Sequence, residues 1–230
     1  GFGELMDIAS YNYQEQWYEQ DRKEYPNRIM VGTESFPYFR GRADYRASVK
    51  PNNTYCDFTI RNPWYDVIEH DYVVGQFIWS GIDYLGESAG WPSKGWPAGI
   101  IDTCGLPKAC AGFHRCAWSE KPKVFIGVMS DSLNMDPGNH WWSWPKMAHH
   151  WNFPEYTGQL IRVETVSNCE SVELIQNGES YGTRDTAESP NNSILWYIPY
   201  SSGSLKAIGK NNGIEVCIDE IITATLPASI

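Results

Sequence analysis

Apolar residues in the first half of the chain fall into short runs that alternate with longer amphipathic segments. The short runs predict strands at residues 5–10, 28–33 and 73–79. The amphipathic segments predict helices at residues 14–25, 63–70 and 106–118. Strands that alternate with helices are typical of βαβ units, so we expect an α/β part with a parallel sheet.

After Pro122 the pattern changes to β-rich runs separated by turn residues. These runs are QLIRVETVS, SVELIQNGES, ILWYIPY and SLKAIGKNNGIEVCIDEII. Asn177-Gly178 and Asn212-Gly213 each lie between two apolar stretches, and an Asn-Gly pair in that position is the strongest short-range signal for a β-hairpin. The spacing predicts an all-β part, an antiparallel sandwich of immunoglobulin-like type.

The two patterns predict two domains, at residues 1–118 and 119–224, with residues 225–230 as the start of a linker to a further domain. Three βα units are too few for a closed (β/α)8 barrel, which needs roughly 250 residues. They would also leave an open sheet edge, which proteins normally cover. We therefore expect the first domain to be a piece of a larger one.

The net charge limits which kinds of partner the chain could bind. With 28 acidic and 18 basic residues the net charge is −10, which argues against nucleic acid and fits poorly with an anionic membrane. No window of 18 apolar residues suggests a membrane span. The opening GFGELMDIAS has no basic and apolar leader pattern, so the sequence leaves the location open, with a periplasmic or secreted parent compatible.

Aromatic residues and cysteines are the compositional outliers. Eleven Trp and fourteen Tyr would suit sugar rings, although most would be expected to pack in a core. The six cysteines include no C-x-x-C pair, and we expect mostly buried thiols. Their spacing does not decide whether Cys169 and Cys217 form a bridge.

The stretch RIMVGTESF ends an apolar run with a single carboxylate, Glu34. We expect Gly32 to let the strand turn tightly just before it. A glutamate in this place is either a reactive group or a structural charge that pairs with an arginine such as Arg40 or Arg42.

Several motifs together resemble one enzyme family. They are DIASYNYQEQWYEQDRKEYPNRIMVGTES, VVGQFIWSGIDYLGE, GIIDTCGLPK, HHWNF and VELIQNGESYG, in this order over nearly the whole chain. The series resembles glycoside hydrolase family 2, and within it the bacterial β-galactosidase-like members. Each motif alone is weak, but the combination is specific.

The resemblance implies that residues 1–118 form strands six to eight of a (β/α)8 TIM barrel, followed by the immunoglobulin-like sandwich. The missing barrel half is expected from the rest of the same polypeptide. The family's nucleophile falls on Glu34. The acid/base glutamate of an Asn-Glu pair has no counterpart in residues 1–118, so it is expected upstream of residue 1, and the fragment alone should be a poor catalyst.

The implied substrate is an oligo- or polysaccharide, most directly a terminal β-galactoside cleaved with retention. Specificity for β-glucuronides, β-mannosides or β-glucosides stays open. A glucuronidase would need cations near the sugar carboxylate, and Arg40, Arg42 and Arg46 in the loop could supply them. The rival hypothesis is a non-catalytic carbohydrate-binding or interaction module, in which Glu34→Gln would leave sugar binding intact.

Residues that could contact the sugar follow the strand ends. Tyr11, Asn12 and Tyr13 either face the pocket or pack the turn, and Tyr13 is the preferred neighbour of Glu34. Trp79 is either a stacking platform or a core residue. Asp83 and Glu87 either accept sugar hydroxyls or hold their loop shut. No nucleotide motif and no ligand spacing for a metal is present, so we expect neither cofactor nor metal.

Overall fold

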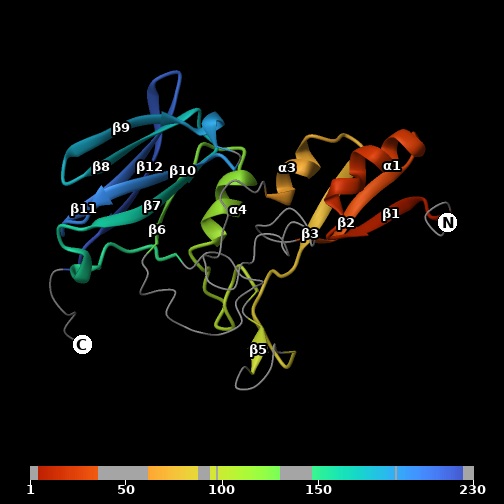
Figure 1. Cartoon of the computed structure of the whole chain (residues 1–230), viewed down its shortest axis with the longest axis horizontal. Helices are drawn as coiled ribbons and strands as arrows, with labels where there is room; N and C mark the ends of the chain where they lie inside the picture. The colour runs from red at the N-terminus through yellow and green to blue at the C-terminus, as the bar shows by residue number, and fades with distance from the viewer. Residues whose placement is uncertain are drawn as a thin grey trace. The chain divides into compact units, whose positions relative to one another are not determined.

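The described residues up to Leu106 form one structural unit, unit 1, and those from Pro107 onward form another, unit 2. The computed structural model describes residues 5–35, 62–87, 94–96, 98–129, 147–189 and 191–224. Figure 1 labels the helices and strands of both units.

Unit 1 is built on a three-stranded parallel sheet in the order β1-β2-β3. The strands are β1 (Ile8–Asn12), β2 (Ile29–Ser35) and β3 (Val73–Ile78). The intervening turns and helices are η2 (Glu15–Trp17), α1 (Tyr18–Glu24) and α3 (Pro63–Ile68). A short antiparallel pair follows, formed by β4 (Tyr84–Leu85) and β5 (Gly95–Trp96).

Local signals explain where the helices of unit 1 begin and end. The side chain of Asn62 accepts a hydrogen bond from the Trp64 backbone N–H at 2.9 Å, and Pro63 occupies the first helical position, where no N–H is needed. At the end of α1, the Tyr25 N–H reaches the Asp21 carbonyl at 2.8 Å just before Pro26. The predicted elements are confirmed with shifted bounds, β1 beginning after the exposed Leu5 and Met6.

The two faces of the parallel sheet differ sharply. Figure 1 shows α1 and α3 on one face, and the core lies there, formed by Ala9, Tyr11, Tyr18, Met30, Val67 and Val73. The opposite face exposes apolar side chains from all three strands, namely Ile8, Ile29, Val74 and Phe77. Parallel sheets are normally covered on both faces, so the second face of this sheet lacks its usual cover within the described residues.

Unit 2 contains two antiparallel sheets, ordered β10-β7-β6 and β12-β11-β8-β9. The strands are β6 (Val124–Met129), β7 (Leu160–Ser167), β8 (Ser171–Gln176), β9 (Glu179–Asp185), β10 (Ser193–Pro199), β11 (Ser204–Asn211) and β12 (Ile214–Ile222). Two single turns, η4 (Pro154–Tyr156) and η5 (Thr186–Glu188), lie in the connections. One core joins both sheets and includes the fully buried Trp151 and Trp196.

Both predicted Asn-Gly hairpins are confirmed. The turn between β8 and β9 has φ values of 49° at Asn177 and 85° at Gly178, and the turn between β11 and β12 has 50° at Asn212 and 74° at Gly213. Two consecutive positive φ values match the right-handed twist of the flanking strands. Strand β6 was not predicted from the sequence.

Helix α4 (Ala111–Ala117) packs on β6 and β7 and belongs to unit 2. A Cβ on Gly112 would lie 2.3 Å from the Phe125 ring, so only glycine allows this close approach. The segment after α4 is held by Asn168, which donates to the carbonyls of Ser119 at 2.8 Å and Lys121 at 2.9 Å and accepts from the Lys123 N–H at 2.7 Å. The domain boundaries at residues 118 and 224 stay a prediction.

The predicted order of an α/β part followed by an all-β part is confirmed. A short parallel sheet precedes antiparallel sheets, and the described strands do not close a barrel. None of the helices in the described ranges has the length and apolar character needed to cross a bilayer.

Candidate active site

The candidate site lies where the three parallel strands of unit 1 end. Strand β1 ends at Asn12, which is paired in register with Glu34 near the end of β2. The Trp79 N–H, directly after β3, donates to the Ser35 carbonyl at 2.8 Å. The carboxyl ends of parallel strands meet at one edge of a sheet, and this edge carries the functional groups of most α/β enzymes.

A bulge in β2 decides which way Glu34 faces. Tyr11 pairs with Gly32 and Asn12 pairs with Glu34, so Thr33 has no partner on β1. Gly32 and Ser35 are both buried, whereas Thr33 and Glu34 between them are both partly exposed. The extra residue therefore turns Glu34 toward the face that the helices leave open, where Asn12 also lies.

Thr33 ties the bulge to the end of β1. Its hydroxyl donates to the side-chain oxygen of Asn12 and lies 3.4 Å from the Tyr11 carbonyl. The Tyr13 N–H donates to the Glu34 carbonyl at 2.8 Å, with Tyr13 itself in a left-handed conformation at φ 55°. These bonds fix the backbone on both sides of Glu34.

The expected role of Gly32 is wrong. Strand β2 does not turn at Gly32 but continues to Ser35. A Cβ on Gly32 would lie 2.8 Å from the Ser35 hydroxyl, 3.1 Å from the Tyr18 hydroxyl and 3.2 Å from Gln76 Cβ. Glycine is needed here because side chains from the helix layer and the neighbouring strand already fill the space, not because the backbone bends.

Tyr84 is a site residue that sequence reasoning missed. Its ring meets Trp79 edge-on at a centroid distance of 6.0 Å, and its hydroxyl donates to Glu87 at 2.8 Å. Burial raises the pKa of Tyr84, as do the hydrogen bond to Glu87 and the negative charge of Glu34, while the bond from Trp79 acts the other way. Tyr84 thus contacts both Trp79 and Glu87, and the charge of Glu34 acts on its hydroxyl. Its only signal in the sequence is its place within GIDYLGE.

Asp83 makes a contact within its own loop. One carboxylate oxygen accepts the Gly99 N–H at 2.8 Å, and the Asp83 N–H donates to the Ile101 carbonyl at 2.8 Å. Both bonds join the two ends of the segment that contains β4 and β5. This is the loop-holding alternative for Asp83; a direct role in sugar binding stays a prediction.

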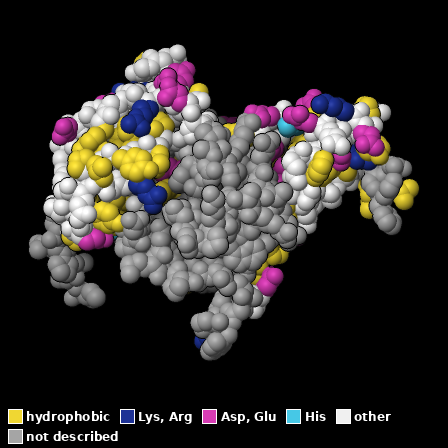
Figure 2. Space-filling model, in the orientation of Figure 1, with side chains coloured by type: hydrophobic (Ala, Val, Ile, Leu, Met, Phe, Trp, Pro, Cys, Tyr) yellow, Lys and Arg dark blue, Asp and Glu magenta, His cyan; other side chains and the backbone are white. Residues whose placement is uncertain are grey.

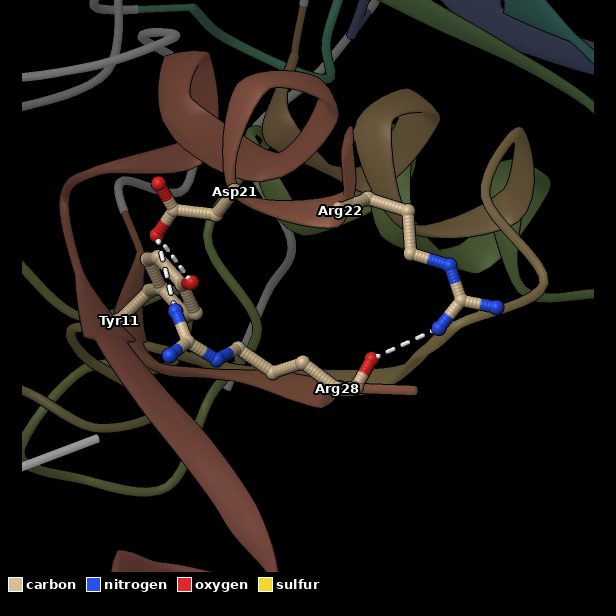
Figure 3. Close-up of polar contacts among 4 residues, drawn as sticks. All are labelled: Tyr11, Asp21, Arg22 and Arg28. Carbon is tan, nitrogen blue, oxygen red and sulfur yellow. Dashed lines mark hydrogen bonds and ion pairs between the residues drawn. The ribbon is translucent and has the colours of Figure 1, made fainter. Parts of the chain in front are cut away.

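Tyr11 lies on the helix-covered face, not beside Asn12 and Glu34. Its hydroxyl donates to Asp21 of α1 at 2.5 Å, as Figure 3 shows. The same carboxylate oxygen forms an ion pair with the Arg28 guanidinium at 3.5 Å. In the same view the Arg22 guanidinium reaches the Arg28 carbonyl at 3.0 Å. Burial, followed by the bond to Asp21, raises the pKa of Tyr11 to about 12.

The structure therefore brings together part of the expected set. Asn12 and Glu34 are register partners at the carboxyl edge, and Trp79 follows β3 at the same edge. Tyr84 contacts both Trp79 and Glu87. The side chain of Tyr13 is buried. Arg40, Arg42 and Arg46 lie outside the described residues. Within the described ranges, no three His, Cys, Asp or Glu side chains gather as metal ligands would.

Comparisons with known proteins cover both units. A family model described as "Domain of unknown function (DUF4982)" matches residues 158–217, in unit 2. The β-galactosidase BoGH2A of Bacteroides ovatus is 26% identical over 253 aligned residues, which cover 98% of this chain and 27% of that protein. The chain thus spans about a quarter of the length of this curated relative.

Solved structures of glycoside hydrolases are also similar to this chain. A glycosyl hydrolase family 2 member from Bacteroides cellulosilyticus matches with a TM-score of 0.78 and 31% identity, over 98% of this chain and 28% of that chain. A β-glucuronidase from glycoside hydrolase family 2 shares the fold with a TM-score of 0.65 at 21% identity, over 97% of this chain and 22% of that chain.

The fold consists of a parallel sheet, with Glu34 and Trp79 at the ends of its strands, followed by antiparallel sheets. Together with these relatives, it places the chain among the glycoside hydrolases. It belongs to glycoside hydrolase family 2, as its motifs predicted.

Proposed function

We propose that the chain forms part of the catalytic domain of a retaining β-glycosidase, with Glu34 as the nucleophile. The observation that carries the proposal is the bulge at Thr33, which turns Glu34 to the open face at the carboxyl edge of the sheet. Family membership supplies the reaction class, hydrolysis of O-glycosidic bonds.

In the proposed reaction the Glu34 carboxylate attacks the anomeric carbon while the bond from that carbon to the leaving oxygen breaks. A second carboxyl group, about 5–5.5 Å away in retaining enzymes, protonates the leaving oxygen. The same group then takes a proton from water, which attacks the anomeric carbon and releases Glu34. Glu87 is bonded to Tyr84 and is not proposed for this role, so the acid/base group is proposed to come from elsewhere in the enzyme.

Unit 1 is proposed to be strands six to eight of a (β/α)8 barrel. The exposed apolar face of the sheet supports this, because in a barrel that face points to an interior filled by side chains of the other strands. Unit 2 is proposed to contain the immunoglobulin-like sandwich that follows, at residues 119–224. Helix α4 is proposed to be the last helix of the barrel domain, residues 1–118, and packs on strands β6 and β7 of the sandwich. Alone, the chain is proposed to be inactive.

The sugar would be held by groups around Glu34. Trp79 is proposed as the stacking surface for the pyranose, with Asn12, Asp83 and Glu87 accepting or donating hydrogen bonds. Tyr84 is added to this set because it touches Trp79 and Glu87. Tyr11 and Tyr13 are proposed to support the site from the buried side.

A terminal β-galactoside is the proposed substrate, supported by the activity for which BoGH2A is named. A β-glucuronide is the second candidate, because a family member of that activity shares the fold. A glucuronide carries a carboxylate that a galactoside lacks, so a cationic side chain at the site would favour the glucuronide.

The test uses a 2-deoxy-2-fluoro β-galactoside with a dinitrophenolate leaving group, which needs little protonation and traps the glycosyl-enzyme. The chain and a longer polypeptide that includes the preceding barrel strands are each labelled, digested and mapped by mass spectrometry. We expect an adduct on Glu34 in the longer polypeptide, none in Glu34→Gln, and an unchanged adduct in the control Glu24→Gln, which changes an exposed carboxylate at the end of α1.

In the longer polypeptide Glu34→Gln should also lower turnover at least about 1,000-fold, since a nucleophile has no substitute in double displacement. An adduct on another carboxylate would overturn the assignment of Glu34. Turnover that survives in Glu34→Gln would also overturn the assignment of Glu34, whereas sugar binding with no turnover by the longer wild-type polypeptide would favour the binding-module alternative. Faster labelling by the corresponding fluoro-glucuronide would reassign the sugar.

A further inference from the structure

Unit 2 holds a pair of cysteines whose sulfurs are in contact. Cys169 lies in the turn between β7 and β8, and Cys217 lies on β12, 48 positions later. Their Sγ atoms are 3.5 Å apart and share a hydrogen bond. Cys169 is 3% exposed, whereas Cys217 is partly accessible to solvent.

A glycine makes room for the two sulfurs. Gly209 on β11 is the register partner of Cys217. A Cβ on Gly209 would lie 2.6 Å from the Cys217 sulfur and 2.8 Å from the Cys169 sulfur. Any side chain on Gly209 would occupy the place where the two sulfurs meet, so the strand between them leaves that place free.

We propose that Cys169 and Cys217 form a disulfide when the folded protein meets a disulfide oxidant such as oxidised glutathione. The sulfurs need to approach by about 1.5 Å to reach the bond length of about 2.0 Å. The bond would tie the β7–β8 turn, where the chain passes from one sheet to the other, to β12 at the edge of the second sheet.

The reaction proceeds in two exchanges. The Cys217 thiolate, the more accessible of the two, attacks one sulfur of oxidised glutathione, whose disulfide breaks and releases one glutathione. The Cys169 thiolate then attacks the Cys217 sulfur of the mixed disulfide and releases the second glutathione. Both cysteines lose a proton and are oxidised, and the oxidant is reduced to two thiols that take up these protons.

Burial, followed by the hydrogen bond to Cys169, raises the pKa of Cys217 to about 12. Thiolate is therefore scarce at neutral pH, and the reaction should accelerate with each step of pH below that value. Cys104 is exposed and provides an internal comparison, since it can react with the oxidant but has no partner sulfur among the contacts of the described residues.

A third thiol provides the competing product. Cys116 on α4 is 2% exposed, and burial, followed by the charge of Cys217, raises its pKa to about 12. The Cys116 sulfhydryl donates to the Val166 carbonyl at 3.5 Å. A random reaction among nearby thiols would also yield Cys116–Cys217, whereas the proposed geometry yields only Cys169–Cys217.

The test is to incubate the native chain with mixtures of reduced and oxidised glutathione at mildly alkaline pH, block free thiols with an alkylating reagent, and map non-reduced peptides. We expect a peptide pair that joins Cys169 to Cys217 and lacks two hydrogens. We also expect the urea midpoint of unit 2 to rise by about 1 M and to return on reduction.

Variants separate the bond from a packing effect. Cys169→Ser and Cys217→Ser should each abolish both the linked peptide and the reversible shift, whereas Cys104→Ser should keep both. A Cys116–Cys217 link, a link that forms only in urea, or glutathione adducts on Cys104 with no link elsewhere would each overturn the proposal. Neither cysteine belongs to unit 1, so the outcome is independent of the proposed glycosidase reaction.

Discussion

Unit 1 and unit 2 bury the apolar faces of their β-sheets in different ways. In unit 2 the apolar faces of two sheets pack on a shared core, and Val163, Val172 and Leu174 are fully buried. In unit 1 helices cover one face of a single sheet, and Phe77 and Val74 on the other face remain 68% and 62% exposed. The candidate nucleophile lies on that uncovered face. Within the described residues, the core of unit 2 lies between its own two sheets, whereas the sheet of unit 1 has a core on one face only.

Figure 2 shows that unit 2 is not wholly polar outside. Apolar side chains gather with basic ones on the visible face of this unit. On β12 the exposed side chains include Ile214, Ile218 and Ile222. Ion pairs of Lys206 with Glu220 and Lys210 with Glu173 lie on the same sheet. Both units therefore expose apolar residues. The difference is that an antiparallel sheet ordinarily leaves one face to solvent, whereas a parallel sheet is ordinarily covered on both faces.

The largest expected difference comes from the same kind of truncation in each unit. Leu174→Ala should lower the free energy of unfolding of unit 2 by about 2–5 kcal/mol, because it leaves a cavity between the two sheets. Phe77→Ala should change the stability of this chain by less than about 0.5 kcal/mol, because the ring is already exposed. Urea unfolding measures both.

In a longer polypeptide that supplies further barrel strands, Phe77→Ala should instead cost about 3–5 kcal/mol. An equally small effect there would contradict the proposal that the open face of unit 1 becomes a barrel interior.

A somewhat smaller loss is expected on the packed face of unit 1. Gly32→Ala should cost about 1–3 kcal/mol, because its methyl group would overlap the hydroxyls of Ser35 and Tyr18. Gly81→Ala is the matched control, since a Cβ there meets nothing within 4 Å, and it should be close to neutral. Thermal unfolding distinguishes them. Equal effects of both substitutions would mean that the helix-covered face is looser than the structure shows.

Packing on the helix-covered face of unit 1 should also affect its stability at alkaline pH. The pKa of Tyr11 is raised from 10.0 to about 12 in the folded state, so its contribution to stability is complete below pH 10 and is lost as the pH rises toward 12. The slope is at most about 1.4 kcal/mol per pH unit for one proton. Tyr11→Phe should remove this part of the alkaline destabilisation of unit 1, whereas Tyr197→Phe, at 59% exposure, should not.

The smallest effect is expected on the outer face of unit 2. The hydrogen bond from Lys210, followed by that from Ser180, lowers the pKa of Glu173, so the stabilisation is present at neutral pH and lost as the pH falls below 4.5. Glu173→Gln should cost about 1 kcal/mol at neutral pH and little in acid. Glu220→Gln, in the looser 3.7 Å pair with Lys206, should cost less than about 0.5 kcal/mol.

Much of the fold could be predicted because its causes are local. Asn177-Gly178 and Asn212-Gly213 specify hairpins, since Asn and Gly tolerate the positive φ that such turns require. The three βα units were predicted from their apolar runs, with Pro26 marking the end of the first helix and Pro63 the start of the second. Strand β6 was missed because VFIGVM has no turn signal pairing it with a neighbour; its partner β7 lies more than thirty residues further on.

The candidate site was harder to predict because its geometry is not local. Period-two alternation from the buried Gly32 would place Glu34 on the helix-covered face, and only the pairing of β2 with β1 reveals the extra residue at Thr33. The same alternation correctly separates Tyr11 from Asn12. Tyr84 could not be distinguished from other tyrosines because its contact with Trp79 exists only in the folded chain.

The three hydrogen bonds of Asn168 bear on where a gene should be cut to produce the sandwich on its own. They hold residues 119–123 against the β7–β8 turn, so a polypeptide starting at residue 119 would place its new terminus inside this hydrogen-bonded corner and discard α4 from the surface of β6 and β7. A polypeptide that starts at Pro107 keeps the corner and the helix together. A gene cut before α4 is therefore expected to yield a more stable isolated sandwich than a gene cut at residue 119.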